Sequence, residues 1–240
     1  VPIVYAIKEA AAHGPSPLVA ALLVAGVGFG VLFVRRQRRA ETPMLDVRLF
    51  ARGAFSGALL VNLLSVLALV GFIYFVSQHL QLIVGLSPMN AGLALVPGLV
   101  LMIVSGLAVV PVAKRVSPRV VIPVALVFSF VGYVMVALST DPGSVALLVV
   151  AFMVLGIGIG AAETVSNELV LASAPPAKAG AASAVSETAY EVGAVLGTSL
   201  LGGLLTALYR ANLVVPQGVP ADVADAARET LAGAVSAANG

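Results

Sequence analysis

The sequence predicts an all-α integral membrane protein with six transmembrane helices. Of its 240 residues, 60% are hydrophobic and only 10% are charged, whereas about 25% of the residues in a soluble domain carry a charge. Six apolar stretches are each long enough to cross the roughly 30 Å of hydrocarbon in a bilayer, which takes about 20 helical residues. The basic residues gather between these stretches. These three observations exclude an ordinary soluble domain.

The six stretches follow one another with short connections, so neighbours in the sequence are expected to run antiparallel. We expect helices because a transmembrane β-strand has only about 10 residues and because backbone in contact with lipid must satisfy its own hydrogen bonds. The first residues resemble the end of an apolar segment, and we interpret the chain as a fragment. The predicted helices are Pro17 to Val34, Phe55 to Leu80, Pro88 to Val112, Pro118 to Leu138, Ser144 to Leu171 and Gly180 to Tyr209.

The basic residues predict the orientation of the helices. Connections on one side of the membrane hold Arg35, Arg36, Arg38, Arg39, Arg48, Arg52, Lys114, Arg115, Arg119 and Lys178, and those on the other side hold only Lys8, Arg210 and Arg228. By the positive-inside rule the first set is cytoplasmic, which also accounts for the net charge of +2 without a nucleic-acid partner. We interpret residues 35–54 as a basic cytoplasmic linker, with contact to anionic lipid as the alternative.

The sixth predicted helix carries two acids, Glu187 and Glu191, inside an otherwise apolar segment. A charge at the centre of a bilayer costs roughly 2.5 to 3.5 kcal/mol, so such residues usually face a bundle interior or a watery cavity and are functional candidates. At about 100° per residue they share a face about 80° wide with small and polar residues. The members of this face are Gly180, Ala184, Glu187, Glu191, Ala194 and Thr198.

The opposite face of the same helix predicts close packing. Ala189, Gly193 and Gly197 recur there every four residues, a spacing of small residues that lets a second helix approach closely in a membrane. We therefore expect this helix to pack by its glycines and to present its acids to a cavity.

The fifth predicted helix also combines glycines with an acid. Gly156 and Gly160 lie within about 60° of Glu163 and Asn167 on a helical wheel. A phosphate-binding loop is excluded, because no strand precedes the glycines and no Lys-Ser/Thr pair follows them. Counted from the shared turn SAPPAK, Glu163 and Glu187 lie at a similar depth, roughly 15 Å. They could therefore face one aqueous pocket, whereas Glu168 is expected to reach interfacial water.

Polar residues on the second predicted helix are further candidates. Asn62 is deep enough to need a hydrogen-bonding partner, so it either joins helices or contacts a ligand. The candidate substrate-binding residues are Asn62, Ser65, Tyr74, Gln78, Gln81, Asn167 and Thr198. His79 has no second histidine nearby, and the chain contains no cysteine, so we expect neither a metal site nor a cofactor.

The residues after the sixth helix read as an extracytoplasmic loop, 210–240, with a short amphipathic helix. The segment ADVADAARETLAGAVSAA is too polar to span a membrane, and Asp222 and Asp225 lie in its first turn, where the helix dipole favours negative charge.

Three phrases in order resemble fourteen-helix drug:proton antiporters of the major facilitator superfamily. QHLQLIVGLSPMNAGLALVPG, residues Gln78 to Gly98, resembles the junction of their ninth and tenth helices. AGAASAVSETAYEVGAVLGTSLLG, residues Ala179 to Gly202, resembles the acidic signature of the thirteenth helix, and RRAETPMLDVRLF resembles the loop that enters the ninth. By this resemblance the chain is a C-terminal half: residues 1–34 contain the end of helix 7 and the accessory helix 8, and residues 55–209 form the bundle of helices 9 to 13.

The resemblance implies export of lipophilic, often cationic drugs and dyes across the bacterial inner membrane, driven by a proton gradient through alternating access. Glu187 and Glu191 stand where members keep the acids of the thirteenth helix. A proton role for Glu163 is inferred from its chemistry. The implied partners are drugs, protons, the lipid bilayer and the N-terminal half of the same transporter.

Three other functions stay open at this point. A facilitator-type exporter of an endogenous lipid or metabolite would use the same scaffold. A membrane scaffold without transport would gain nothing from buried acids. A membrane enzyme would need a nucleophile or a metal cluster, and no Ser-His-Asp arrangement or paired histidine is apparent in the sequence, so we expect no enzymatic activity.

Overall fold

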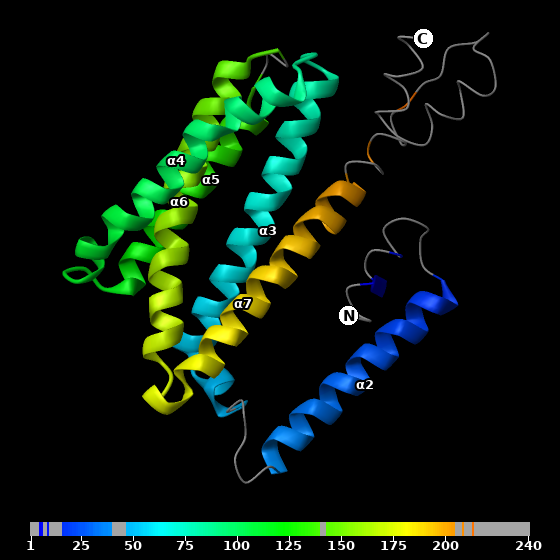
Figure 1. Cartoon of the computed structure of the whole chain (residues 1–240), viewed down its shortest axis with the longest axis vertical. Coiled ribbons are helices and arrows are strands. Elements are labelled where there is room, and N and C mark those ends of the chain that lie inside the picture. The colour runs from blue at the N-terminus through cyan, green and yellow to red at the C-terminus, as the bar shows by residue number, and fades with distance from the viewer. Residues whose placement is uncertain are drawn as a thin grey trace.

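The computed structural model describes residues 5–6, 9, 16–39, 47–139, 143–204, 208 and 213, and each regular element in these ranges is helical (Figure 1). The predicted all-α fold is therefore confirmed. The loop and short helix predicted for 210–240, apart from Leu213, lie outside the described residues, as do Lys8 and His13.

Six long helices form the described part of the chain. They are α2 (Pro17–Arg39), α3 (Gly53–Leu82), α4 (Pro88–Ala113), α5 (Pro118–Ala137), α6 (Val145–Ala172) and α7 (Ala179–Leu196). Each overlaps one predicted stretch. The helices α2 to α6 are long and apolar enough to cross a membrane, and α7 is more polar because it carries Glu187 and Glu191.

Two boundaries differ from the predicted ones. The helix α2 continues to Arg39, so Arg35 to Arg39 form its last turns, and a short 3-10 helix, η1 (Val47–Ala51), precedes α3. The helix α7 continues into a π-helical segment, η3 (Gly197–Leu201), followed by helical residues to Leu204. Hydropathy marks only where an apolar stretch ends, whereas helical backbone can continue into polar residues, as it does from Val34 to Arg39 in α2.

Prolines and serines begin several of the helices. Ser87 Oγ accepts a hydrogen bond of 3.3 Å from the backbone N–H of Asn90 at the start of α4, and Ser144 Oγ accepts one of 3.4 Å from that of Leu147 at the start of α6. Such caps satisfy amide donors that have no partner inside the helix. Pro88 and Pro118 occupy the first positions of α4 and α5, where proline loses no hydrogen bond.

Helix α6 lies at the centre of the bundle, packed between α4 and α5 on one side and α3 on the other (Figure 1). The glycines of α6 set its distances from α4 and α5. A Cβ added at Gly156 would lie 2.5 Å from the carbonyl oxygen of Gly98 in α4, and one at Gly160 would collide with the carbonyl oxygen of Met102. A Cβ at Gly158 would meet the backbone of α5. Both neighbours therefore approach α6 as closely as backbone allows.

Two apolar clusters hold α3 against α6. An upper cluster contains Phe72 of α3 with Leu155 and Ile159 of α6, and Leu69 packs against it. A lower cluster contains Phe55 and Ala58 of α3, Val170 of α6, Ala182 of α7 and Leu49 of η1. We call the contact between α3 and α6 the seam. Between the two clusters, the seam contains polar residues.

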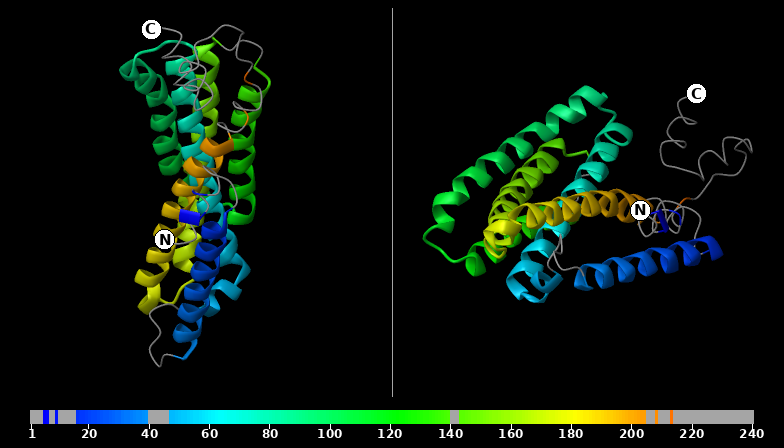
Figure 2. Two further views of the ribbon diagram at one scale, coloured as in Figure 1. Left: turned by 90° about the vertical axis from the view of Figure 1, so that its right-hand side faces the viewer. Right: turned by 60° about the horizontal axis from the view of Figure 1, so that its bottom comes forward.

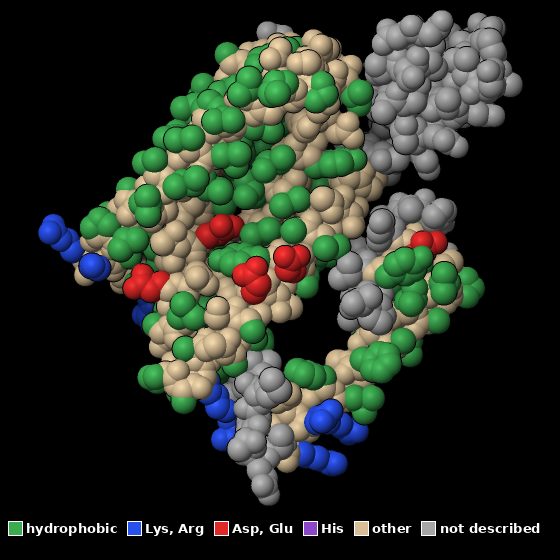
Figure 3. Space-filling model, in the orientation of Figure 1, with side chains coloured by type: hydrophobic (Ala, Val, Ile, Leu, Met, Phe, Trp, Pro, Cys, Tyr) green, Lys and Arg blue, Asp and Glu red, His purple; other side chains and the backbone are tan. Residues whose placement is uncertain are grey.

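Figure 2 shows α2 along the side of the bundle on which α7 lies, with η1 between α2 and the start of α3. Lys and Arg side chains lie at the helix ends where α2 and α4 stop and where α3, α5 and α7 begin (Figure 3). This segregation and the five apolar spans describe a multi-pass membrane protein. Which end faces the cytoplasm stays a prediction from the positive-inside rule.

Candidate functional site

One face of α7 packs against α3 through small residues. Ala189, Gly193 and Gly197 are buried there. A Cβ at Gly193 would lie 2.5 Å from the carbonyl oxygen of Leu63, and one at Gly197 would lie 2.6 Å from that of Leu67. The two backbones are therefore nearly in contact, which leaves this face no room for a ligand.

The opposite face of α7 is exposed and acidic. Glu187, Glu191 and Thr198 are exposed, and acidic side chains lie together on the face of the bundle that α6 and α7 form (Figure 3). Thr198 Oγ1 donates within its own helix, to the carbonyl oxygens of Val195 at 3.0 Å or Ala194 at 3.2 Å. The two carboxylates are thus the groups on this face that can bind a cation or a proton.

Glu163 on α6 lies close to this acidic face but reaches inward. The residue is half-buried, and its Oε1 atom is fully buried without a hydrogen-bonding partner. Tyr190 of α7 is near enough to interact electrostatically with both Glu163 and Glu187. The fold therefore brings the acids of α6 and α7 into one neighbourhood, whereas Glu168 is exposed near the end of α6.

A chain of side-chain hydrogen bonds joins three helices beside these acids. Asn62 Nδ2 of α3 donates to Ser186 Oγ of α7 at 3.1 Å, and Ser186 Oγ donates to Asn167 Oδ1 of α6 at 2.9 Å. Asn62 is fully buried and Ser65 is 4% exposed, so both lie inside the packed seam. Asn62 therefore joins helices in this structure, and a contact between substrate and Asn62, Ser65 or Asn167 stays a prediction.

The other polar candidates on α3 lie toward its far end, away from the acids. Gln78 Nε2 donates to Tyr74 Oη at 3.3 Å, and Gln81 Nε2 donates to Ser77 Oγ at 2.9 Å. Tyr74 lines a small apolar cavity of about 320 Å³ with Tyr133 and Leu201. The structure does not bring these residues together with Glu187 and Glu191.

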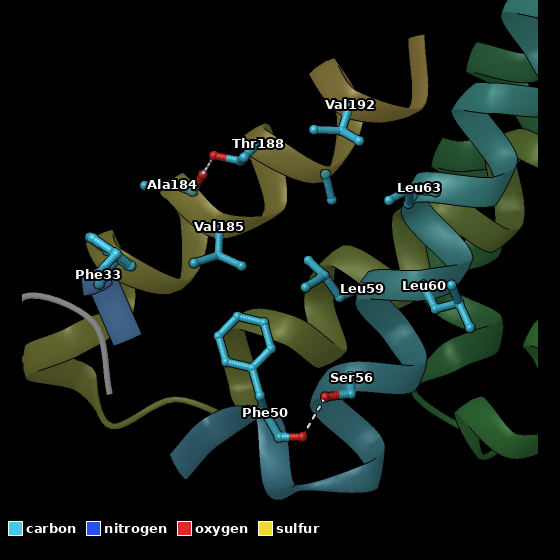
Figure 4. A pocket seen from close by; sticks show the side chains of 12 residues that line it. Phe33, Phe50, Ser56, Leu59, Leu60, Leu63, Ala184, Val185, Thr188 and Val192 are labelled. Carbon is cyan, nitrogen blue, oxygen red and sulfur yellow. Dashed lines mark hydrogen bonds between the residues drawn. The ribbon is translucent and has the colours of Figure 1, made fainter. Parts of the chain in front are cut away.

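A larger cavity, of about 680 Å³, lies between α2, η1, α3 and α7 (Figure 4). Its two hydroxyls are already bonded to backbone: Ser56 Oγ donates to the carbonyl oxygen of Phe50 at 2.7 Å, and Thr188 Oγ1 donates to that of Ala184 at 2.8 Å. The walls are therefore apolar. The lining residues that give this character are Phe33, Phe50, Leu59, Leu60, Leu63, Val185 and Val192.

The cavity and the acids share helix α7. Ala184, Thr188 and Val192 line the cavity, and on the helical surface they lie next to Glu187 and Glu191, because residues three and four apart are neighbours. An apolar molecule in the cavity could thus carry a positive charge at its edge and place it near a carboxylate. The arrangement suits a lipophilic cation.

Sequence reasoning missed Ser186, Tyr190, Phe33 and Phe50. Ser186 was detectable, because it continues the row of small residues formed by Ala182, Ala189 and Gly193. The two phenylalanines were not, since η1 and the end of α2 bring them to the cavity from outside any periodic pattern. Among the described residues, no group of three or more His, Cys, Asp and Glu side chains could hold a metal ion.

A family model described as the Major Facilitator Superfamily matches residues 10–198. The chain is 50% identical over 237 residues to the multidrug efflux pump LfrA of Mycolicibacterium smegmatis, covering 99% of this chain and 47% of that protein. It is 31% identical over 245 residues to the methyl viologen resistance protein SmvA of Salmonella typhimurium, covering 99% and 48%.

A third relative, the puromycin resistance protein pur8 of Streptomyces alboniger, is 34% identical over 229 residues, with 94% of this chain and 46% of that protein covered. The chain thus spans about half the length of the curated relatives it matches.

Proposed function

Since the chain belongs to the Major Facilitator Superfamily, we propose that it forms part of a transporter that exports lipophilic, often cationic drugs across the bacterial inner membrane in exchange for protons. The membership favours a transporter over an enzyme. The observation that carries the proposal is the position of Glu187 and Glu191, exposed on α7 at the edge of an apolar cavity.

The cavity and the acids account for the substrate class. A lipophilic body gains free energy from leaving water in proportion to the apolar area that it buries, roughly 25 cal/mol per Å². A neighbouring carboxylate adds Coulomb attraction for a positive charge. The relatives named for multidrug efflux and for methyl viologen resistance support this class, because methyl viologen is an organic cation.

Carboxylates also account for the proposed exchange. A carboxyl group can hold a proton, and an arriving cation favours its ionised form and expels the proton. Glu187 and Glu191 lie one helical turn apart on the exposed face of α7, so one cation can approach both. Glu163 is proposed as a third participant, because the fold places it beside Tyr190 and the α7 acids.

The remaining walls of the substrate cavity are proposed to come from the other half of the transporter, with alternating access between the two sides of the membrane. The exposed acidic face of α7 supports this, since an acid-bearing surface is far cheaper beside a protein-lined aqueous cavity than beside lipid.

The test is transport of a fluorescent lipophilic cation into inverted vesicles that contain the full-length transporter. Glu187→Gln/Glu191→Gln should abolish uptake driven by a pH gradient and keep measurable substrate binding, because an amide resembles a protonated acid but cannot release a proton. Glu168→Gln is the matched control, an exposed acid on α6 outside the site, and it should transport normally.

Two outcomes would contradict the proposal. Normal gradient-driven uptake by the double variant would show that the acids of α7 do not couple transport to protons. Uptake by the unmodified protein that persists unchanged with an uncoupler would instead indicate a facilitator-type exporter, and a panel of lipids and metabolites would then identify its substrate.

A further inference from the structure

A layer of polar residues interrupts the apolar seam between α3 and α6. We call Asn62 and Ser65 of α3 together with Glu163 and Ser166 of α6 the polar layer. Below it, Ala58 and Val170 belong to one apolar cluster, and above it Leu69 packs against the other cluster, which contains Ile159. The polar layer is therefore enclosed by hydrophobic side chains at both ends.

The register of the two helices places the four residues of the layer opposite one another. The helices are antiparallel, and Asn62 of α3 and Asn167 of α6 both bond to Ser186 Oγ, so these two residues lie at a similar level. Asn62 lies one turn from Ala58 along α3, and Ser166 lies one turn from Val170 along α6. The next turn brings Ser65 to the level of Glu163.

Each residue of the polar layer has a buried oxygen with no hydrogen-bonding partner. These atoms are Asn62 Oδ1, Ser65 Oγ, Glu163 Oε1 and Ser166 Oγ, and they are the buried side-chain polar atoms in the described part of the chain that lack one. Asn62 and Ser166 are 0% exposed and Ser65 is 4% exposed. Buried polar atoms in proteins usually have a hydrogen-bonding partner, so these four oxygens are free to act as ligands.

The hydrogen-bond chain fixes the direction in which Asn62 points its oxygen. Ser186 Oγ donates to Asn167 Oδ1 at 2.9 Å and accepts a hydrogen bond of 3.1 Å from Asn62 Nδ2. Asn62 thus presents its NH₂ group to Ser186, which leaves Oδ1 for the polar layer. The amide oxygen is thus oriented by α6 and α7 before any ligand arrives.

The chemistry of the layer selects a small, hard, monovalent cation. All four free atoms are oxygens, the donors that hard cations prefer. Only one of them belongs to a carboxylate, so a single positive charge neutralises the site, and among the described residues no group of three or more His, Cys, Asp and Glu side chains could hold a divalent ion. The described Lys and Arg side chains lie at helix ends, away from the layer.

We propose that the polar layer binds one sodium ion through Asn62 Oδ1, Ser65 Oγ, Glu163 Oε1 and Ser166 Oγ. Glu163 provides the entry path, because the half-buried side chain reaches from the exposed acidic face to the layer. The ion would tie α3 to α6 beside the α7 acids. Binding to purified protein requires no transport, so this inference stands or falls separately from the proposed function.

The test compares sodium, potassium and N-methylglucamine chlorides at ~0.1 M, where charges more than about 10 Å apart are screened alike in all three. Sodium should raise the unfolding midpoint of the full-length transporter in detergent by about 3 °C or more relative to N-methylglucamine. Radioactive sodium should bind saturably, with potassium competing weakly.

Variants locate the ion. Ser166→Ala and Glu163→Gln should each weaken sodium binding at least about tenfold and remove the midpoint shift, which corresponds to the loss of one ligand from a buried charge. Ser129→Ala is the matched control, since Ser129 is also buried in a span but its hydroxyl already donates to the carbonyl oxygen of Ala125. That variant should respond to sodium like the unmodified protein.

Equal midpoints in the three salts would overturn the proposal and leave water as the occupant of the layer. A sodium shift retained in Ser166→Ala and Glu163→Gln would place the ion elsewhere. If Glu163→Gln fails to fold, Ser65→Ala removes a different ligand without touching the carboxylate, and normal sodium binding by Ser65→Ala and Ser166→Ala together would refute the site.

Discussion

Helices α6 and α7 are both rich in small residues and both carry acids, yet the fold uses them differently. Twelve residues of α6 are buried, against four of α7. The helix α6 meets neighbours through the glycines on several faces, whereas α7 packs on α3 along one face and leaves the other exposed. Small residues in a membrane helix therefore mark close packing, and the number of faces that they occupy distinguishes a central helix from a peripheral one.

The strongest test of this difference is Gly160→Leu in α6. A side chain there would meet the carbonyl oxygen of Met102 and Ser105 Oγ of α4, and backbone cannot move aside as a flexible side chain can. We expect a loss of more than about 3 kcal/mol in stability, seen as a collapse in folded yield by size-exclusion chromatography. Gly28→Leu in α2, where an added Cβ meets nothing within 4 Å, should leave the yield unchanged.

Gly193→Leu in α7 should cost less, about 2 kcal/mol. The contact with the carbonyl oxygen of Leu63 is as close as those in α6, but α7 has a single packed face and can tilt outward. The unfolding midpoint in detergent should fall, and Gly180→Leu on the same helix, which has nothing within 4 Å, should not change it. Equal midpoints for the two variants would show that the close contact between α7 and α3 adds nothing to stability.

Ser186→Ala tests the polar contact between α6 and α7. The substitution removes the partner of both Asn62 Nδ2 and Asn167 Oδ1, and leaving such buried groups unpaired costs about 1 to 3 kcal/mol. We expect a lowered midpoint, with Ser183→Ala, an exposed serine on the same helix, as the unaffected control. A midpoint that stays constant would mean that water replaces the hydroxyl in the chain.

The smallest effect on stability is expected for Glu187→Gln/Glu191→Gln. Both acids are exposed on the face of α7 that packs against nothing in the described structure, so the unfolding midpoint should stay constant or rise slightly while gradient-driven uptake is lost. Loss of transport without loss of stability would show that the exposed face of α7, unlike the packed faces of α6, does not hold the fold together. A large fall in the midpoint would instead assign these acids a structural role.

Much of the site was predictable because it depends on periodicity. The acidic face of α7 and the glycine row opposite it follow from 100° per residue alone, and the structure places Glu187 and Glu191 on one side and Gly193 and Gly197 on the other. The cavity was not predictable, since Phe33 and Phe50 reach it from α2 and η1, and no local pattern states where separate segments meet.

The sequence by itself determined the membrane class, the approximate limits of the six long helices in the described part of the chain, and the face of α7 that carries charge. These properties depend on hydropathy and helical geometry, which act within a single segment. Only the tertiary structure decided that Asn62 bonds to Ser186, that Ser65 and Glu163 each bury an oxygen without a hydrogen-bonding partner, and that α6 is central. Those outcomes depend on the register between helices, which is set where backbones approach at glycines far apart in the chain.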